Sequence, residues 1–134
     1  MYKRLYWVGV AVLALSILSS FSIRGGAEEL FGVSVNKLSF AEGEVLVLTV
    51  TNDSFSEVTT GYGYHIMVYE DGEWNQVLPV DAVPAVTIIV RRFDSFRQEI
   101  DLSSLAPGEY VLVKEIYKGG ETHTYHFDIK ITDD

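Results

Sequence analysis

The chain has 134 residues and no cysteine, so disulfides, thiolate metal sites and a cysteine nucleophile are excluded. Seven of the ten basic and all nineteen acidic residues lie from Glu28 onward, which gives that part a net charge of −12. A domain this acidic repels phosphate backbones and anionic headgroups, so we expect it to bind neither nucleic acid nor lipid.

The first 27 residues are organised as an export segment. Two basic residues precede an apolar run over residues 5–18, and small residues follow up to Ala27. This order is typical of a secretory signal peptide, which the small-x-small rule allows to be cleaved after Ser22 or after Ala27. The alternative is an uncleaved hydrophobic helix, because residues 5–23 are nearly long enough to span a bilayer. Both interpretations place residues 28–134 outside the cytoplasm as one domain, which meets the membrane only through residues 5–23 if the segment is uncleaved.

Residues 28–134 are predicted to be all-β. Alternating and β-branched runs, separated by turn formers such as Asp71-Gly72 and Gly119-Gly120, predict strands at 31–40, 45–51, 57–70, 73–78, 85–92, 96–102, 110–117 and 122–131. Seven to nine short strands with a turn signal about every 8–12 residues favour an antiparallel immunoglobulin-like sandwich with Greek-key connections. A closed barrel has similar strand spacing and is the alternative fold.

Three motifs resemble the small bacterial-type immunoglobulin-like domains of exported proteins. They are VLTVTNDS at 47–54, GYGYHI at 61–66 followed by DGEW at 71–74, and IDL at 100–102 followed by LAPGEYVLVK at 105–114. The resemblance extends over residues 33–131. It implies a sandwich fold, a location outside the cytoplasm and a role as an accessory, adhesive or binding module, and it supplies no catalytic residues.

The most specific of these motifs is a corner formed by Pro107, Gly108 and Tyr110. It looks like the tyrosine corner of sandwich domains. We therefore expect the Tyr110 ring to be buried and its hydroxyl to bond a backbone group in the preceding connection.

No residue pattern indicates catalysis or cofactor binding. The sequence has no nucleophile elbow and no phosphate-binding loop. His123 and His126 lie three apart in a predicted strand, so they point to opposite faces and are poorly placed to chelate one metal ion. Asn52 begins an Asn-x-Ser sequon, which makes it a candidate glycosylation site, although the same residues are also turn formers.

Four aromatic residues form the candidate partner surface, namely Tyr62, Tyr64, Tyr69 and Trp74. The strand that contains the three tyrosines is apolar on both faces, so it either packs within the sheet or presents aromatic rings to a partner. We therefore expect a non-catalytic module that binds a protein or a surface polymer. The alternative is a proteinase inhibitor of sandwich fold. An exported hydrolase is disfavoured by the lack of a nucleophile motif.

Overall fold

The computed structural model describes residues 30–133, and every regular element within them is a β-strand. In chain order the strands are β1 (Phe31–Val35), β2 (Ser39–Ala41), β3 (Val45–Asn52), β4 (Val58–Thr60), β5 (His65–Glu70), β6 (Glu73–Leu78), β7 (Ile88–Val90), β8 (Asp94–Asp101), β9 (Gly108–Lys118) and β10 (Glu121–Thr132). The expected export segment and its hydrophobic helix lie outside the described residues. Residues 30–133 contain no helix that is long and apolar enough to cross a membrane.

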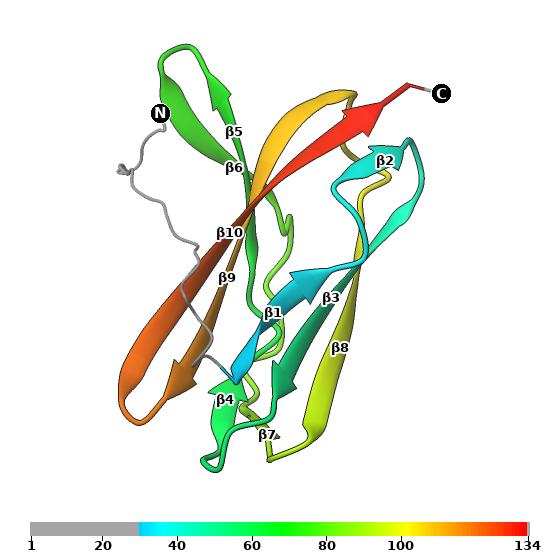
Figure 1. Cartoon of the computed structure of the whole chain (residues 1–134). Helices are drawn as coiled ribbons and strands as arrows, with labels where there is room; N and C mark the ends of the chain where they lie inside the picture. Colours follow the sequence, from blue (N-terminus) through cyan, green and yellow to red (C-terminus); the bar gives the residue numbers. More distant parts are fainter. Residues whose placement is uncertain (1–29, 134) are drawn as a thin grey trace.

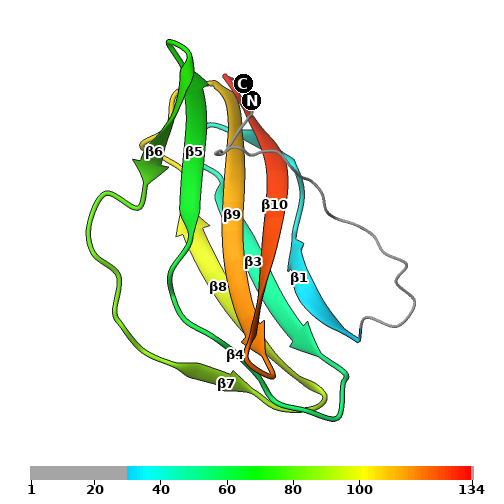
Figure 2. The ribbon, with the colours of Figure 1, turned by 90° about the vertical axis from the view of Figure 1, so that its left-hand side faces the viewer.

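The strands form two facing open sheets (Figure 1). One sheet has the order β1-β3-β8, and the other has the order β2-β10-β9-β4-β7, with β5 also paired to β9 and β6 paired to β5. Figure 2 shows β5, β9 and β10 in the layer nearer the viewer, with β3 and β8 behind them. The immunoglobulin-like sandwich predicted from the strand pattern is therefore confirmed, and the barrel alternative is wrong because neither sheet closes on itself.

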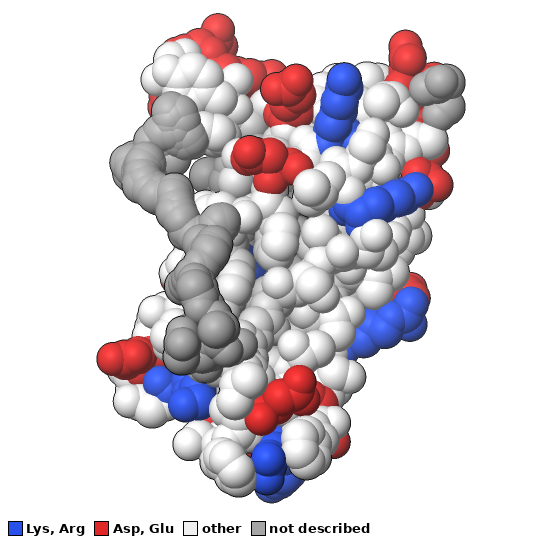
Figure 3. Space-filling view, in the orientation of Figure 1, with Lys and Arg blue, Asp and Glu red and all other residues white. Residues whose placement is uncertain are grey.

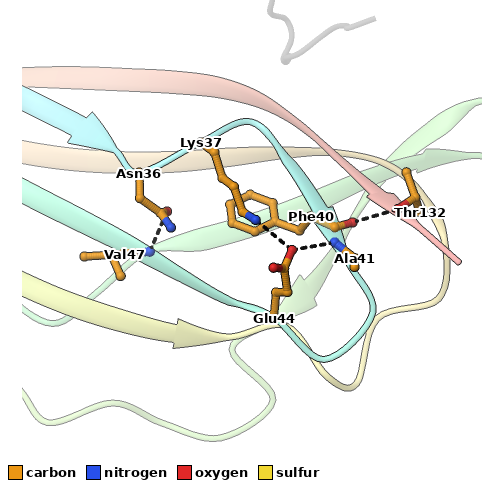
Figure 4. A network of polar contacts seen from close by, with 7 residues as sticks. All are labelled: Asn36, Lys37, Phe40, Ala41, Glu44, Val47 and Thr132. Atoms are coloured by element: carbon orange, nitrogen blue, oxygen red, sulfur yellow. Dashed lines mark hydrogen bonds and ion pairs between the residues drawn. The ribbon is translucent and has the colours of Figure 1, made fainter. Parts of the chain in front are cut away.

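The single first strand predicted over residues 31–40 is wrong, because the chain changes sheets within it. β1 pairs antiparallel with β3, whereas β2 pairs parallel with β10. Polar contacts hold the crossing segment in place (Figure 4): Lys37 Nζ lies 2.8 Å from Glu44 Oε1, and the same oxygen accepts a hydrogen bond from the Ala41 amide. An apolar pattern does not reveal such a change, since both strands face one shared core.

The long strand predicted over residues 57–70 is also wrong, since residues 61–64 separate β4 from β5. The strand predicted over residues 85–92 is shortened to β7. Residues 79–87 pair with no strand of the described chain. As a result, β5 lies beside the first half of β9 and β4 lies beside its end. The larger sheet therefore has an opening between the β4–β7 pair and the β5–β6 pair.

The core lies between the two sheets and is built from the inward positions of both. In β3, for example, Leu46, Leu48 and Val50 are fully buried and alternate with more exposed residues. The full set of buried hydrophobic residues is Phe40, Leu46, Leu48, Val50, Val58, Ile66, Leu78, Val90, Ile100, Leu102, Leu105, Tyr110, Leu112, Ile116, Ile129 and Ile131. In a chain without cysteine, burial of these side chains is the main favourable contribution to folding.

The connection between β8 and β9 has the geometry that the tyrosine-corner hypothesis requires. The Tyr110 ring is buried, and its hydroxyl donates a hydrogen bond of 2.6 Å to the carbonyl of Ala106. Burial raises the pKa of Tyr110, and the charge of Glu70 raises it further. The hydroxyl therefore stays protonated and fastens the corner to the strand that follows it.

Removing the Tyr110 hydroxyl tests this corner. Tyr110→Phe should lower the free energy of unfolding by about 1 kcal/mol, because the Ala106 carbonyl loses its donor while the ring remains. Tyr110→Ala should lower it by about 3 kcal/mol, because a cavity is also left. Urea denaturation followed by circular dichroism measures both effects. Midpoints equal to the parent's for both variants would show that the corner adds nothing to stability.

Candidate functional site

A buried lysine lies beneath the opening in the larger sheet. Lys114 is in the middle of β9, on the same face as the buried Leu112 and Ile116. Its ammonium donates hydrogen bonds to the carbonyls of Gly61 at 2.6 Å and Gly63 at 2.8 Å. These carbonyls belong to the segment that separates β4 from β5, so the lysine holds the interruption in place.

Gln98 of β8 completes the arrangement from the opposite sheet. Its amide nitrogen donates to the Tyr62 carbonyl at 2.8 Å, and its amide oxygen lies 3.3 Å from Lys114 Nζ. All three carbonyls of residues 61–63 are therefore bonded by buried side chains. We call Lys114, Gln98 and the backbone of residues 61–63 the lysine clamp.

The lysine clamp contains a charge that has no carboxylate partner within the described residues. Only 1% of Lys114 is exposed, and the loss of water around the ammonium lowers its pKa from 10.5 to about 8. Carbonyl and amide oxygens substitute for the missing water, and the Phe96 ring lies 6.0 Å from the ammonium. At neutral pH the group is mainly charged and each of its hydrogen bonds is charge-assisted.

On the outer side of the sheet, the same interruption leaves a groove of about 500 Å³. Residues 59–65 form one wall, residues 83–87 form the other, and the outward side chains of β9 form the floor, namely Val113, Glu115 and Tyr117. The walls lie close together at Gly61, where an added Cβ would lie 3.1 Å from the Val86 carbonyl oxygen. A larger residue at position 61 would push the second wall outward, so glycine sets the width of the groove here.

The polar side chains of the groove are suited to binding. The Tyr117 hydroxyl donates to Glu115 Oε1 at 3.2 Å, and burial together with the Glu115 charge raises the pKa of Tyr117. On one wall, His65 Nδ1 lies 2.7 Å from Gln76 Oε1. Among the described residues no three His, Asp or Glu side chains come together as metal ligands. The groove therefore offers an aromatic ring, a carboxylate and an imidazole as separate contact points.

Comparison with known proteins identifies the family. The bacterial Ig-like domain family matches residues 27–130, which is most of the sequence. This chain belongs to that family. Bacterial Ig-like domains are typically non-catalytic and are usually found in exported or surface proteins. No curated protein matches the sequence significantly.

Two solved structures resemble this bacterial Ig-like domain distantly. A PapD-like domain of human CEP192 has 14% sequence identity and a TM-score of 0.45, with 90% of this chain and 98% of that chain covered. The β-glucosidase from Listeria innocua, solved with gluconolactone, has 15% identity and a TM-score of 0.43. That match covers 75% of this chain but only 16% of the glucosidase. Likenesses this weak carry no argument about function.

The structure divides the candidate partner surface into two places. Tyr62 and Tyr64 lie in the interrupted segment, where Tyr62 packs edge-on against Phe96 and Tyr64 packs against the core. Tyr69 and Trp74 contact each other across the β5–β6 hairpin, with ring centroids 5.3 Å apart. Only the first pair borders the groove. The predicted single aromatic surface is therefore not assembled.

Asn52 is a structural residue, and a glycan on it is incompatible with this fold. It is fully buried, and its amide nitrogen donates to the carbonyls of Ser56 and Val90, both at 2.8 Å. Its amide oxygen accepts from the Ser54 amide and hydroxyl. A glycan would replace one of these N–H donors and would need space that the packing does not provide. The sequon therefore acts through its turn-forming chemistry.

The residue that sequence analysis missed is Lys114. Strict alternation places it on the buried face of β9 with Tyr110 and Leu112, so a signal was present in the pattern. Lysine is almost never fully buried unless it is paired, which is why composition alone assigns it to the surface. Its partners are backbone carbonyls, and no sequence motif identifies these.

Lys114→Met tests whether the lysine clamp supports the fold. The variant keeps the length of the side chain but leaves the Gly61 and Gly63 carbonyls without donors, so the free energy of unfolding should fall by about 3 kcal/mol. The matched control is Lys130→Met, because Lys130 is exposed on β10. Chemical denaturation measures both variants. Equal stability of Lys114→Met and the control would contradict the clamp.

The pH dependence of stability follows from the lowered pKa of Lys114. Between pH 8 and 10 the unfolded chain keeps a proton that the folded chain releases, so the free energy of unfolding should rise with pH. The rise attributable to Lys114 is about 2 kcal/mol, obtained by comparing the parent with Lys114→Met over this range. Above pH 10 the raised pKa values of Tyr64, Tyr110 and Tyr117 act in the opposite direction. If the free energies of unfolding of the parent and of Lys114→Met rise in parallel between pH 8 and 10, the rise does not come from Lys114.

Proposed function

We propose that this bacterial Ig-like domain is an exported, non-catalytic binding module that holds a protein or a surface polymer in the groove above the lysine clamp. The observation that carries the proposal is the groove itself. It is a hollow in the outer face of a sheet, and charge-assisted hydrogen bonds fix one of its walls from the inside. A wall fixed in this way does not have to be ordered when a partner binds, which reduces the entropic cost of binding.

The side chains of the groove favour recognition over catalysis. Tyr117 and Val86 are large apolar residues that are 42% and 49% exposed, and both line the groove. Glu115 and His65 add polar contacts near them. Exposed aromatic surface beside a few polar groups is the usual composition of a binding site for a protein or polymer segment.

The location that we propose rests on the family and on the N-terminal sequence. Residues 1–27 serve as a signal peptide or membrane anchor, and residues 28–134 form the domain outside the cytoplasm. The basic start, the apolar run and the small residues before Glu28 support this division.

Fractionation of cells that produce the full chain tests the location. The domain should be recovered outside the cytoplasmic membrane, either in the medium or held in the membrane with residues 28–134 accessible to added protease. N-terminal sequencing distinguishes cleavage after Ser22 or Ala27 from an intact anchor. Recovery mainly in the cytosol would refute the proposed location.

Substitution in the groove tests the binding function. Tyr117→Ala removes the exposed ring from the floor, whereas the matched control Arg97→Ala changes an exposed residue of β8 on the other sheet. The purified chain is mixed with envelope proteins and wall polymers of the producing cells, and the components that bind the parent are identified. Tyr117→Ala should bind these components at least tenfold more weakly than the parent, and the control should bind them as tightly as the parent. Equal affinities of Tyr117→Ala and Arg97→Ala would show that the groove is not the binding site. Equimolar inhibition of a secreted protease would instead support the inhibitor alternative.

A further inference from the structure

Two phenylalanine rings project into solvent at one end of the sandwich with an arginine between them. Phe55, in the β3–β4 loop, is 83% exposed, and Phe93, in the β7–β8 turn, is 70% exposed. The Arg92 guanidinium carbon lies 3.8 Å from the centre of the first ring and 4.3 Å from the centre of the second. We call Phe55, Arg92 and Phe93 the aromatic tip. Large apolar side chains gathered at an exposed site mark an interaction surface.

The aromatic tip is held rigidly. The buried Asn52 side chain bonds to Ser56 in one loop and to Val90 before the other, and the Asn52 carbonyl accepts from the Phe93 amide. Phe93 has a φ of +68°, a left-handed conformation that is unfavourable for a bulky side chain and that glycine adopts freely. An exposed ring kept at a strained turn contributes little to the core, so its role concerns what lies outside the domain.

The chain enters the domain at the same end. The Leu30 carbonyl accepts a hydrogen bond of 2.6 Å from the Asp53 amide, two residues before Phe55. Residues 24–29 connect Leu30 to the hydrophobic segment at 5–23, and six residues span at most about 20 Å. An uncleaved anchor would therefore hold the aromatic tip close to the membrane surface.

The charges of the domain are consistent with this orientation. Acidic side chains gather at the upper end of Figure 3, over the β5–β6 hairpin, where Glu70, Asp71 and Glu73 lie in sequence. That hairpin points away from the end where the chain enters (Figure 1). Near the tip, Arg92 forms no ion pair with a described carboxylate, and Lys118 lies over the Phe31 ring at the start of β1. Arg92 therefore offers a positive charge beside the two rings, although Asp53 lies in the same loop as Phe55 and Asp94 follows Phe93.

We propose that the aromatic tip rests on the lipid surface when the N-terminal segment is uncleaved, with both phenyl rings in the interfacial layer and Arg92 among the headgroup phosphates. The proposal rests on the exported location proposed above. It also revises the expectation from net charge, because the proposed contact is made by two rings and an arginine rather than by the domain as a whole. Contact by two rings is weak alone, but the anchor makes it intramolecular and so raises the local lipid concentration.

Site-specific labelling of the full chain tests the proposal, and the absence of native cysteine makes single labels simple. Ser56→Cys places a fluorophore beside the tip, and Glu73→Cys places the control on the acidic hairpin, because both residues are exposed. Each labelled chain is reconstituted into vesicles of phosphatidylcholine and phosphatidylglycerol that contain nitroxide-headgroup lipid. Quenching at position 56 should exceed quenching at position 73 at least threefold.

A double substitution removes the two rings of the aromatic tip without destabilising the fold. Phe55→Ser with Phe93→Gly removes both rings, and the glycine relieves the strained turn, so the melting temperature should equal or exceed the parent's. Quenching at position 56 should then fall to less than half of its former value. Quenching that is unchanged by the two substitutions would overturn the proposal.

The remaining outcomes separate this inference from the proposed function. Equal quenching at positions 56 and 73 in an anchored chain would overturn the lipid contact, and would point to a protein partner for the tip, while export and groove binding stand. Complete cleavage after Ser22 or Ala27 in cells would overturn the anchored arrangement and leave groove binding unaffected. Loss of groove binding in the ring-deleted chain would show that the tip acts on the groove, which also contradicts the proposal.

Discussion

An ammonium group in a nearly dry core is the interaction on which the shape of this domain depends. Lys114 is enclosed between two sheets, and the oxygens that replace its water come from the backbone of residues 61–63 and from Gln98. If that segment continued as a regular strand, its carbonyls would pair with a neighbouring strand and the ammonium would be left without partners. The cost of burying an unpaired charge exceeds that of breaking a strand, so the strand breaks.

The break separates β4 from β5 and opens the larger sheet. The groove lies on the outer face of the sheet at this opening. The same residues thus face two environments: their carbonyls bond the lysine inside, and their outer side forms a wall of the groove. The Lys114 ammonium is therefore bonded directly to the backbone of that wall.

The sequence predicted the class of fold because strand periodicity and turn chemistry are local properties. Asp71-Gly72 and Gly119-Gly120 have the positive φ values that their hairpins require, as predicted. The change of sheet between β1 and β2 and the break at residues 61–64 were not predictable, because each depends on partners distant in sequence. The exposed aromatic tip was missed for the same reason, since Phe55 and Phe93 are distant in sequence and meet through Asn52 and the pairing of β4 with β7.

The most direct test of the central claim is the titration of Lys114 by NMR, with the chemical shifts of its side-chain carbon and nitrogen nuclei followed from pH 6 to 11. The lysine clamp predicts that Lys114 titrates near pH 8, well below the ordinary lysine pKa of about 10.4. It also predicts slow exchange of the ammonium protons with water at lower pH. A Lys114 that titrates near the ordinary lysine value would mean that its ammonium is hydrated, and the origin of the groove would then have to lie elsewhere.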